Sequence, residues 1–294
     1  MKFWLATAFL DTDEALDVAR AADRAGYHGI TVSDHLVYPK ELSSPYPYSE
    51  DGKPIWAPDT PWPDPWCLIS AMAGVTADLR FTTNIYVAPA RDLFSVAKAV
   101  STAAVVSRGR VALGLAAGWC REEFALTGQD FARRGKRLDE MMQVLRRLWS
   151  SEWVEHHGEF YDFEALRMAP VPTQPIPLYV GGTSDAAMRR AARLGDGWIG
   201  NAYTEEQAEA ELERLRGHLG DAGRSGDDSF EVIIALLAPP KPDIYKRWED
   251  RGVSGMVCAP WMMADVSDAR YRSPLDARLA AIERYAERVI VPMG

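Results

Sequence analysis

A histidine beside an aspartate is the clearest candidate for proton chemistry in this chain. Asp34 and His35 directly follow the short apolar run Gly29–Ser33. An imidazole titrates near pH ~6.5, so it can donate or accept a proton at neutral pH. His35 is therefore the candidate acid or base. The alternative is a loop histidine that is hydrogen-bonded for structural reasons only.

A second candidate site is the run Gly181, Gly182, Thr183 and Ser184, which follows an apolar run and precedes a helical pattern. Two glycines let a ligand approach the backbone, and amides and hydroxyls at a helix start can bind an anion. The alternative is a tight turn with a helix cap. The sequence has neither GxxxxGK[ST] nor GxGxxG, so it shows no P-loop and no dinucleotide fingerprint.

The segment after residue 118 carries further reactive residue types. Cys120 could be a nucleophile only beside a base, and packing is the alternative. Glu122 and Glu123 fit the start of a helix, where acids are favourable. A basic cluster follows at Arg133, Arg134, Lys136 and Arg137. It is either a solvated face or an anion clamp.

The elements that must position these residues alternate between short apolar runs and helical patterns. The predicted strands are 2–9, 29–33, 81–87, 110–115, 177–180, 198–199, 231–237 and 255–258. This alternation predicts a parallel sheet of the α/β class. About eight units in 294 residues favour a closed (β/α)8 TIM barrel, with the whole chain 1–294 as one domain, over an open doubly wound sheet.

Two insertions interrupt the alternation. Residues 37–63 form an extended loop after the second strand, and loops at the carboxyl ends of barrel strands commonly carry function. Residues 154–163 read as a small hairpin that turns at Gly158, after the fourth helix. Residues 265–272 read as a loop without an assigned role.

Composition excludes several classes of function. The net charge is −9, which argues against a nucleic-acid partner. Three cysteines without a CxxC pair predict neither a disulfide framework nor a metal site, and they favour a reducing, cytoplasmic compartment. No apolar run approaches the ~20 residues that span a bilayer, so no membrane partner is expected.

Several segments together resemble the bacterial luciferase-like flavin and deazaflavin oxidoreductase superfamily, and in particular its branch assigned to coenzyme F420. They are SDHLVYP (33–39), YPYSEDG (46–52), TPWPDPW (60–66), GRVALGLAAGWCREEF (109–124), FARRGKRLDEM (131–141), PIPLYVGGTS (175–184) and ARLGDGW (192–198). The resemblance extends from Met1 to about Asn201 and is weak beyond that residue.

The resemblance implies a cofactor ring across the end of the third strand. Family members often have a non-proline cis peptide bond there, and the matching bond is that between Asn84 and Ile85. By the same resemblance, Asp34 would hydrogen-bond the ring or ribityl region. His35 would stand near the reacting carbon.

The resemblance also implies a phosphate site and a homodimer. Gly181, Gly182 and Thr183 would bind the cofactor phosphate, and Asn201 matches a position that reaches the phosphate side. The homodimer is an expectation from the family alone.

One position departs from the sugar-phosphate dehydrogenases of this superfamily. They carry an acidic residue shortly after the fourth strand, where this chain has Trp119, and Glu122 and Glu123 lie further along. An aromatic, apolar substrate mouth is therefore expected, although core packing is the alternative for each ring. Its candidate residues are Trp119, Tyr86 and Trp66, together with Trp56 and Trp62.

Three functions fit these observations. The first is hydride transfer between F420 and a small organic substrate, with His35 exchanging the proton. The second is an FMN-dependent monooxygenase that uses reduced flavin and oxygen. The third is a non-catalytic cofactor-binding protein on the same fold.

Overall fold

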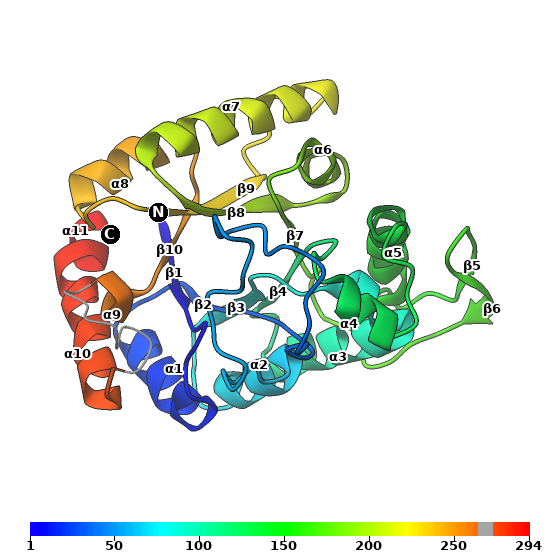
Figure 1. The fold of residues 1–294 in the computed structure, drawn as a ribbon, viewed down its shortest axis with the longest axis horizontal. Helices are drawn as coiled ribbons and strands as arrows, with labels where there is room; N and C mark the ends of the chain where they lie inside the picture. Colours follow the sequence, from blue (N-terminus) through cyan, green and yellow to red (C-terminus); the bar gives the residue numbers. More distant parts are fainter. Residues whose placement is uncertain (264–272) are drawn as a thin grey trace.

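The computed structural model describes residues 1–263 and 273–294, so the predicted loop at 265–272 lies outside the described residues. Within them, eight parallel strands close into a barrel in the order β1-β10-β9-β8-β7-β4-β3-β2 (Figure 1). The strands are β1 Lys2–Ala6, β2 Gly29–Val32, β3 Arg80–Thr83, β4 Val111–Leu115, β7 Leu178–Gly181, β8 Gly197–Tyr203, β9 Glu231–Leu236 and β10 Gly255–Cys258. The predicted TIM barrel is confirmed.

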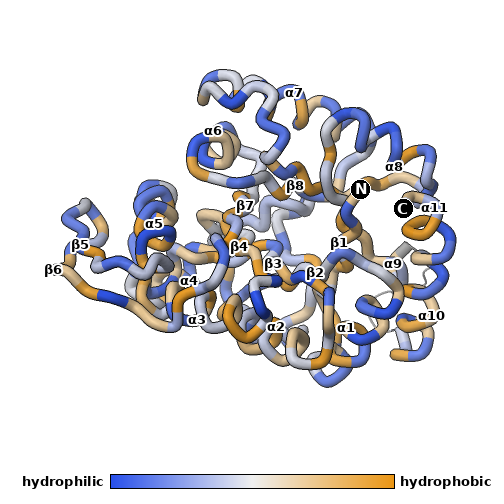
Figure 2. The backbone as a smooth tube through the Cα atoms, turned by 180° about the vertical axis from the view of Figure 1, so that it is seen from behind, coloured by the Kyte–Doolittle hydropathy of each residue, from blue (hydrophilic) through white to orange (hydrophobic). Residues whose placement is uncertain are grey.

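Helices follow the strands and surround the barrel (Figure 1). They are α1 Ala15–Arg24, α2 Pro65–Ala73, α3 Leu93–Val106, α4 Arg121–Leu126, α5 Arg134–Leu148, α6 Asp185–Leu194, α7 Glu205–Asp221, α8 Pro242–Glu249, α9 Pro260–Met263, α10 Leu275–Tyr285 and α11 Val291–Met293. Figure 2 shows α1 and α7 alternating between hydrophilic and hydrophobic colour, as amphipathic helices do. None of the described helices is both long and apolar enough to cross a membrane.

Strand alternation divides the core into two layers. Phe3 and Leu5 of β1 belong to the large cluster between the barrel and its helices. Trp4, between them, belongs to a separate cluster with side chains from four other strands. Since successive strand side chains point to opposite faces, this second cluster fills the barrel interior. Gly29 leaves room for the Trp4 ring, which a Cβ atom at that position would overlap.

The two insertions stand where the sequence predicts them. The loop 37–63 lies between β2 and α2. Strands β5 Val154–His157 and β6 Asp162–Leu166 form an antiparallel hairpin that projects from one side of the barrel (Figure 1). The carboxylate of Glu140 on α5 fastens the hairpin, since its Oε1 lies 3.0 Å from Nε2 of His156 and accepts the amide of Tyr161 at 2.9 Å.

Candidate active site

His35 follows β2 at the carboxyl end of the barrel and lies against α4. Its Nδ1 is 3.2 Å from Oε1 of Glu123, and the amide of Leu36 donates to the same oxygen at 2.8 Å. The Glu123 side chain is only 2% exposed and that of His35 is 12% exposed. The sequence indicated Glu123 only as a helix-start acid, so its contact with His35 is a finding of the structure.

Asp34 is held from two sides beneath this site. Its Oδ1 accepts Nη2 of Arg91 at 2.7 Å, and its Oδ2 accepts the amide of Val87 at 3.0 Å. Burial raises the pKa of Asp34, while the guanidinium and the amide act in the opposite direction. The carboxylate therefore fixes the backbone after β3 by contacts made within the chain. Its expected contact with the cofactor stays a prediction.

Three indoles surround the His35 ring. Trp56 and Trp62 from the loop 37–63 lie with ring centroids 4.8 and 5.1 Å from the imidazole, and Trp119 lies at 5.8 Å. Tyr46 of the same loop packs on Trp119 at 5.2 Å. The extended loop thus folds over His35 and supplies the aromatic side chains expected at the mouth.

Two residues predicted for substrate contact lie elsewhere. Trp66 and Tyr86 are each only 3% exposed and pack on one another, with Arg91 4.3 Å above the Tyr86 ring. The two rings pack in the core beneath the site and do not line its open side. The residue type alone does not show whether Trp66 and Tyr86 lie in the core or at the substrate mouth, because aromatic rings are common in both places.

The ends of β2, β3 and β7 meet beside His35. The Asn84–Ile85 peptide bond is cis, which confirms the prediction for this bond. The hydroxyl of Ser33 donates to the carbonyl of Asn84 at 3.0 Å. A Cβ atom on Gly181 would lie 2.7 Å from the Ile85 side chain, so only glycine fits there without a shift.

The turn after β7 offers free donors at the start of α6. Gly182 adopts a positive φ of 110°, and the Ser184 hydroxyl caps the helix by accepting the amide of Ala187 at 3.2 Å. In residues 1–263 and 273–294, the amides of Asp185 and Ala186 have no acceptor, as is usual for a first turn. These amides can bind an anion.

A guanidinium that sequence reasoning missed stands beside this turn. Nη2 of Arg214 on α7 donates to the carbonyl of Thr183 at 3.0 Å and to Asp185 at 2.7 Å. Asn201 is exposed on β8. No spacing in the sequence relates Arg214 to residue 183, because the contact joins two separate helical units.

Cys120 is a buried thiol at the start of α4. It is 3% exposed, and burial raises its pKa to about 12, so the thiolate is scarce at neutral pH. Burial and the raised pKa both favour packing over nucleophilic chemistry at this position.

The basic cluster is largely used within the fold. Arg133 pairs with Glu159, Arg134 donates to the carbonyl of Gly118 at 2.9 Å, and Arg137 donates to the carbonyl of Arg91 at 3.2 Å. These three guanidinium groups fasten loops around α5, which argues against an anion clamp.

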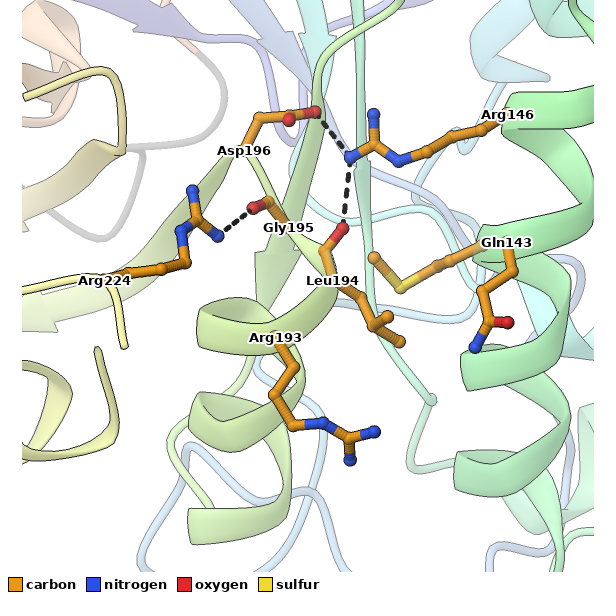
Figure 3. A pocket seen from close by; sticks show the side chains of 8 residues that line it. Gln143, Arg146, Arg193, Leu194, Gly195, Asp196 and Arg224 are labelled. Atoms are coloured by element: carbon orange, nitrogen blue, oxygen red, sulfur yellow. Dashed lines mark hydrogen bonds and ion pairs between the residues drawn. The ribbon is translucent and has the colours of Figure 1, made fainter. Parts of the chain in front are cut away.

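One hollow lies at the opposite, amino-terminal end of the barrel. Its volume is about 390 Å³, and it opens between α5 and α6. Arg146 and Arg224 reach the turn before β8 from opposite sides, where they donate to the carbonyls of Leu194 and Gly195 (Figure 3). Both guanidinium groups are therefore used to hold the carboxyl-terminal end of α6. Among the described residues, no group of three or more metal-ligating side chains forms a metal site.

Comparison with known proteins gives a family match over most of the chain. The model of the luciferase-like monooxygenase family matches residues 4–284. The family match therefore extends well past residue 201, beyond which the resemblance in sequence motifs is weak. Uncharacterized protein Rv0940c of Mycobacterium tuberculosis is 36% identical over 293 residues, which cover 99% of both chains.

A more distant relative and two solved structures have named activities. The F420-dependent hydroxymycolic acid dehydrogenase of Mycobacterium tuberculosis is 28% identical over 201 residues, or 65% of this chain and 49% of that protein. The coenzyme F420-dependent tetrahydromethanopterin reductase of Methanopyrus kandleri has a TM-score of 0.76 at 14% identity, over 100% of this chain and 99% of that one. Monooxygenase RslO1 of Streptomyces bottropensis has a TM-score of 0.75 at 18% identity, over 100% of both chains.

Proposed function

The chain belongs to the luciferase-like monooxygenase family, and we propose that it is an oxidoreductase that transfers a hydride between coenzyme F420 and a small organic substrate. The observation that carries the proposal is the junction of three strand ends. Asn84 accepts a hydrogen bond from Ser33, which directly precedes Asp34 and His35, and Ile85 packs against Gly181 at the end of β7. We infer that one ligand lying on these residues can contact both His35 and the free amides at the start of α6. The dehydrogenase relative supports F420 as the cofactor.

The residues present fit a phosphate-bearing deazaflavin. The free amides at the start of α6 can receive its phosphate, with Gly181, Gly182 and Thr183 providing backbone and hydroxyl donors. Arg214 holds the carbonyl of Thr183 in this turn, and its charge is balanced by Asp185 and Glu211. The ring would lie on the cis bond at Asn84–Ile85. Bound there, the reduced cofactor supplies a hydride, which deazaflavins carry without oxygen chemistry.

His35 completes the transfer with a proton. When a C=C, C=N or C=O bond accepts a hydride at carbon, the partner atom takes a proton from His35, and the bond becomes saturated. In alcohol oxidation, His35 accepts the hydroxyl proton as the hydride leaves the carbon. The surrounding Trp56, Trp62 and Trp119 exclude water and favour an uncharged, apolar substrate over a sugar phosphate.

A fluorescence titration of the purified protein with F420 and, separately, with FMN tests the cofactor. Micromolar binding of F420 with weak FMN binding supports the proposal, and a screen of enones, imines and alcohols then follows. Preference for FMN with oxygen uptake favours a monooxygenase. Tight F420 binding without turnover across the screen favours a non-catalytic carrier, and binding of neither cofactor refutes the assigned site.

A further inference from the structure

The contact between α4 and His35 defines which imidazole nitrogen is available. Oε1 of Glu123 lies 3.2 Å from Nδ1 of His35 and also accepts the amide of Leu36. An ionised carboxylate can only accept hydrogen bonds, and a hydrogen bond from His35 to such a carboxylate requires the hydrogen on Nδ1. The backbone amide holds the same oxygen in place, which leaves Glu123 little freedom to turn away.

We propose that Glu123 is a positioning residue that fixes His35 as the Nδ1–H tautomer, so that Nε2 exchanges the proton with the substrate. This inference rests on the proposed role of His35. A carboxylate behind an imidazole both orients the ring and stabilises its protonated form. Glu123 thereby adjusts His35 for proton transfer without touching substrate or cofactor itself.

The other ring nitrogen is left open. Across residues 1–263 and 273–294, nothing hydrogen-bonds to Nε2 of His35, and the ring packs against Trp56, Trp62 and Trp119. Indole rings shield the imidazole from water but cannot ionise. Nε2 is therefore the nitrogen available to a ligand.

In the part of the chain that the structure describes, few charged groups lie close to this ring besides Glu123. The adjacent Asp34 carboxylate is paired with Arg91 and accepts the amide of Val87. Two more titratable groups stand at the start of α4. Cys120 is buried, and Glu122 turns toward the loop, where it accepts the amide and hydroxyl of Ser43 at 2.6 and 2.7 Å. Tyr46 lies behind Trp56 and Trp119.

Glu122 supplies the matched control. It is the neighbouring glutamate of the same helix turn, and it binds the loop rather than His35. Glu122→Gln and Glu123→Gln therefore make the same chemical change one residue apart. Only the second removes the negative charge behind the imidazole.

The first test is nitrogen NMR of histidine in the wild-type protein at pH 8, with the His35 signal assigned from a His35→Gln spectrum. We expect the pattern of an Nδ1–H, Nε2-bare imidazole. An Nε2–H pattern overturns the proposal. This measurement needs no cofactor and no variant of Glu123, so its result stands even where F420 fails to bind and the proposed function falls.

The second test is the pH profile of kcat with F420 and the substrate found in the screen. For Glu123→Gln we expect kcat to fall about 10-fold or more and the midpoint of the profile to move ~1 pH unit or more toward acid. The midpoint moves toward acid in both reaction directions, because Glu123→Gln removes the negative charge that stabilises the protonated imidazole of His35. Glu122→Gln should leave the midpoint in place. An unshifted midpoint in Glu123→Gln, or an equal shift in both variants, refutes the proposal.

Discussion

A Cβ atom on Gly181 would lie 2.7 Å from Cδ1 of Ile85, so the end of β7 is packed directly against the side chain that follows β3. We therefore expect Gly181→Ala to displace Ile85 and to destabilise the protein by about 1–3 kcal/mol, as overpacking does. F420 affinity should fall as well. Thermal unfolding and the fluorescence titration measure these effects. Gly217→Ala on α7, where a Cβ meets nothing within 4 Å, is the control and should be neutral or stabilising.

Removing the imidazole should separate binding from chemistry. We expect His35→Ala to retain F420 affinity within a few-fold and to lower kcat roughly 10²–10⁴-fold, which is the usual contribution of a general acid or base. Steady-state kinetics with the screened substrate measure the change. His157→Ala, on the exposed hairpin strand β5, is the matched control. Turnover unchanged in His35→Ala removes this residue from the mechanism.

The Asp34–Arg91 pair should matter mainly to stability. Asp34→Asn leaves a guanidinium whose side chain is 13% exposed without its charged partner, and breaking such a buried pair costs about 3–5 kcal/mol. Urea unfolding measures the loss. Asp17→Asn breaks an exposed pair with Arg20 and should cost at most about 1 kcal/mol. An equal loss of unfolding free energy in Asp34→Asn and Asp17→Asn would contradict a larger contribution of the buried pair to stability.

His28 should make the fold sensitive to acid. Burial lowers its pKa from 6.5 to about 4, and Lys2 and Arg80 act in the same direction. Between these two values the unfolded chain binds a proton that the folded chain does not, so the free energy of unfolding falls as the pH drops. Above pH 6.5 the residue has no such effect. Unfolding measured from pH 7 to pH 4 should show a shallower decline in His28→Gln, and parallel curves would argue against this origin.

The three cysteines should differ in reactivity. Cys67 is exposed, whereas burial raises the pKa of both Cys120 and Cys258 to about 12. Iodoacetamide at pH 8 should therefore label the native protein at Cys67 alone, and slowly, because Asp64 raises the pKa of that thiol. Mass spectrometry locates the label, and unfolding in urea should expose all three sites. Labelling of Cys120 in the native protein would show that its thiol is reactive and would make it a candidate nucleophile.

Local patterns predicted the barrel well because each strand–helix unit carries its own signals. Asp64 before Pro65 caps α2, and Thr204 with Gln207 forms a capping box on α7, so both helix starts are set by residues that are neighbours in the sequence. The contact of Glu123 with His35 joins positions 88 residues apart, and no periodicity encodes such a distance. His28 is partly buried against Trp4, and the sequence does not show this, because a histidine just before a strand does not reveal which residue packs on it.

The attachment of the loop 37–63 has a consequence for how this protein can diversify. The loop carries Trp56 and Trp62 to the site, and its first part is tied to α4 through the contact of Ser43 with Glu122. Neither strand pairing in the barrel nor the Gly181 turn depends on its sequence. We therefore expect that grafting a relative's loop 37–63 together with its α4 changes the aromatic surroundings of His35 and leaves the contact between Gly181 and Ile85 in place.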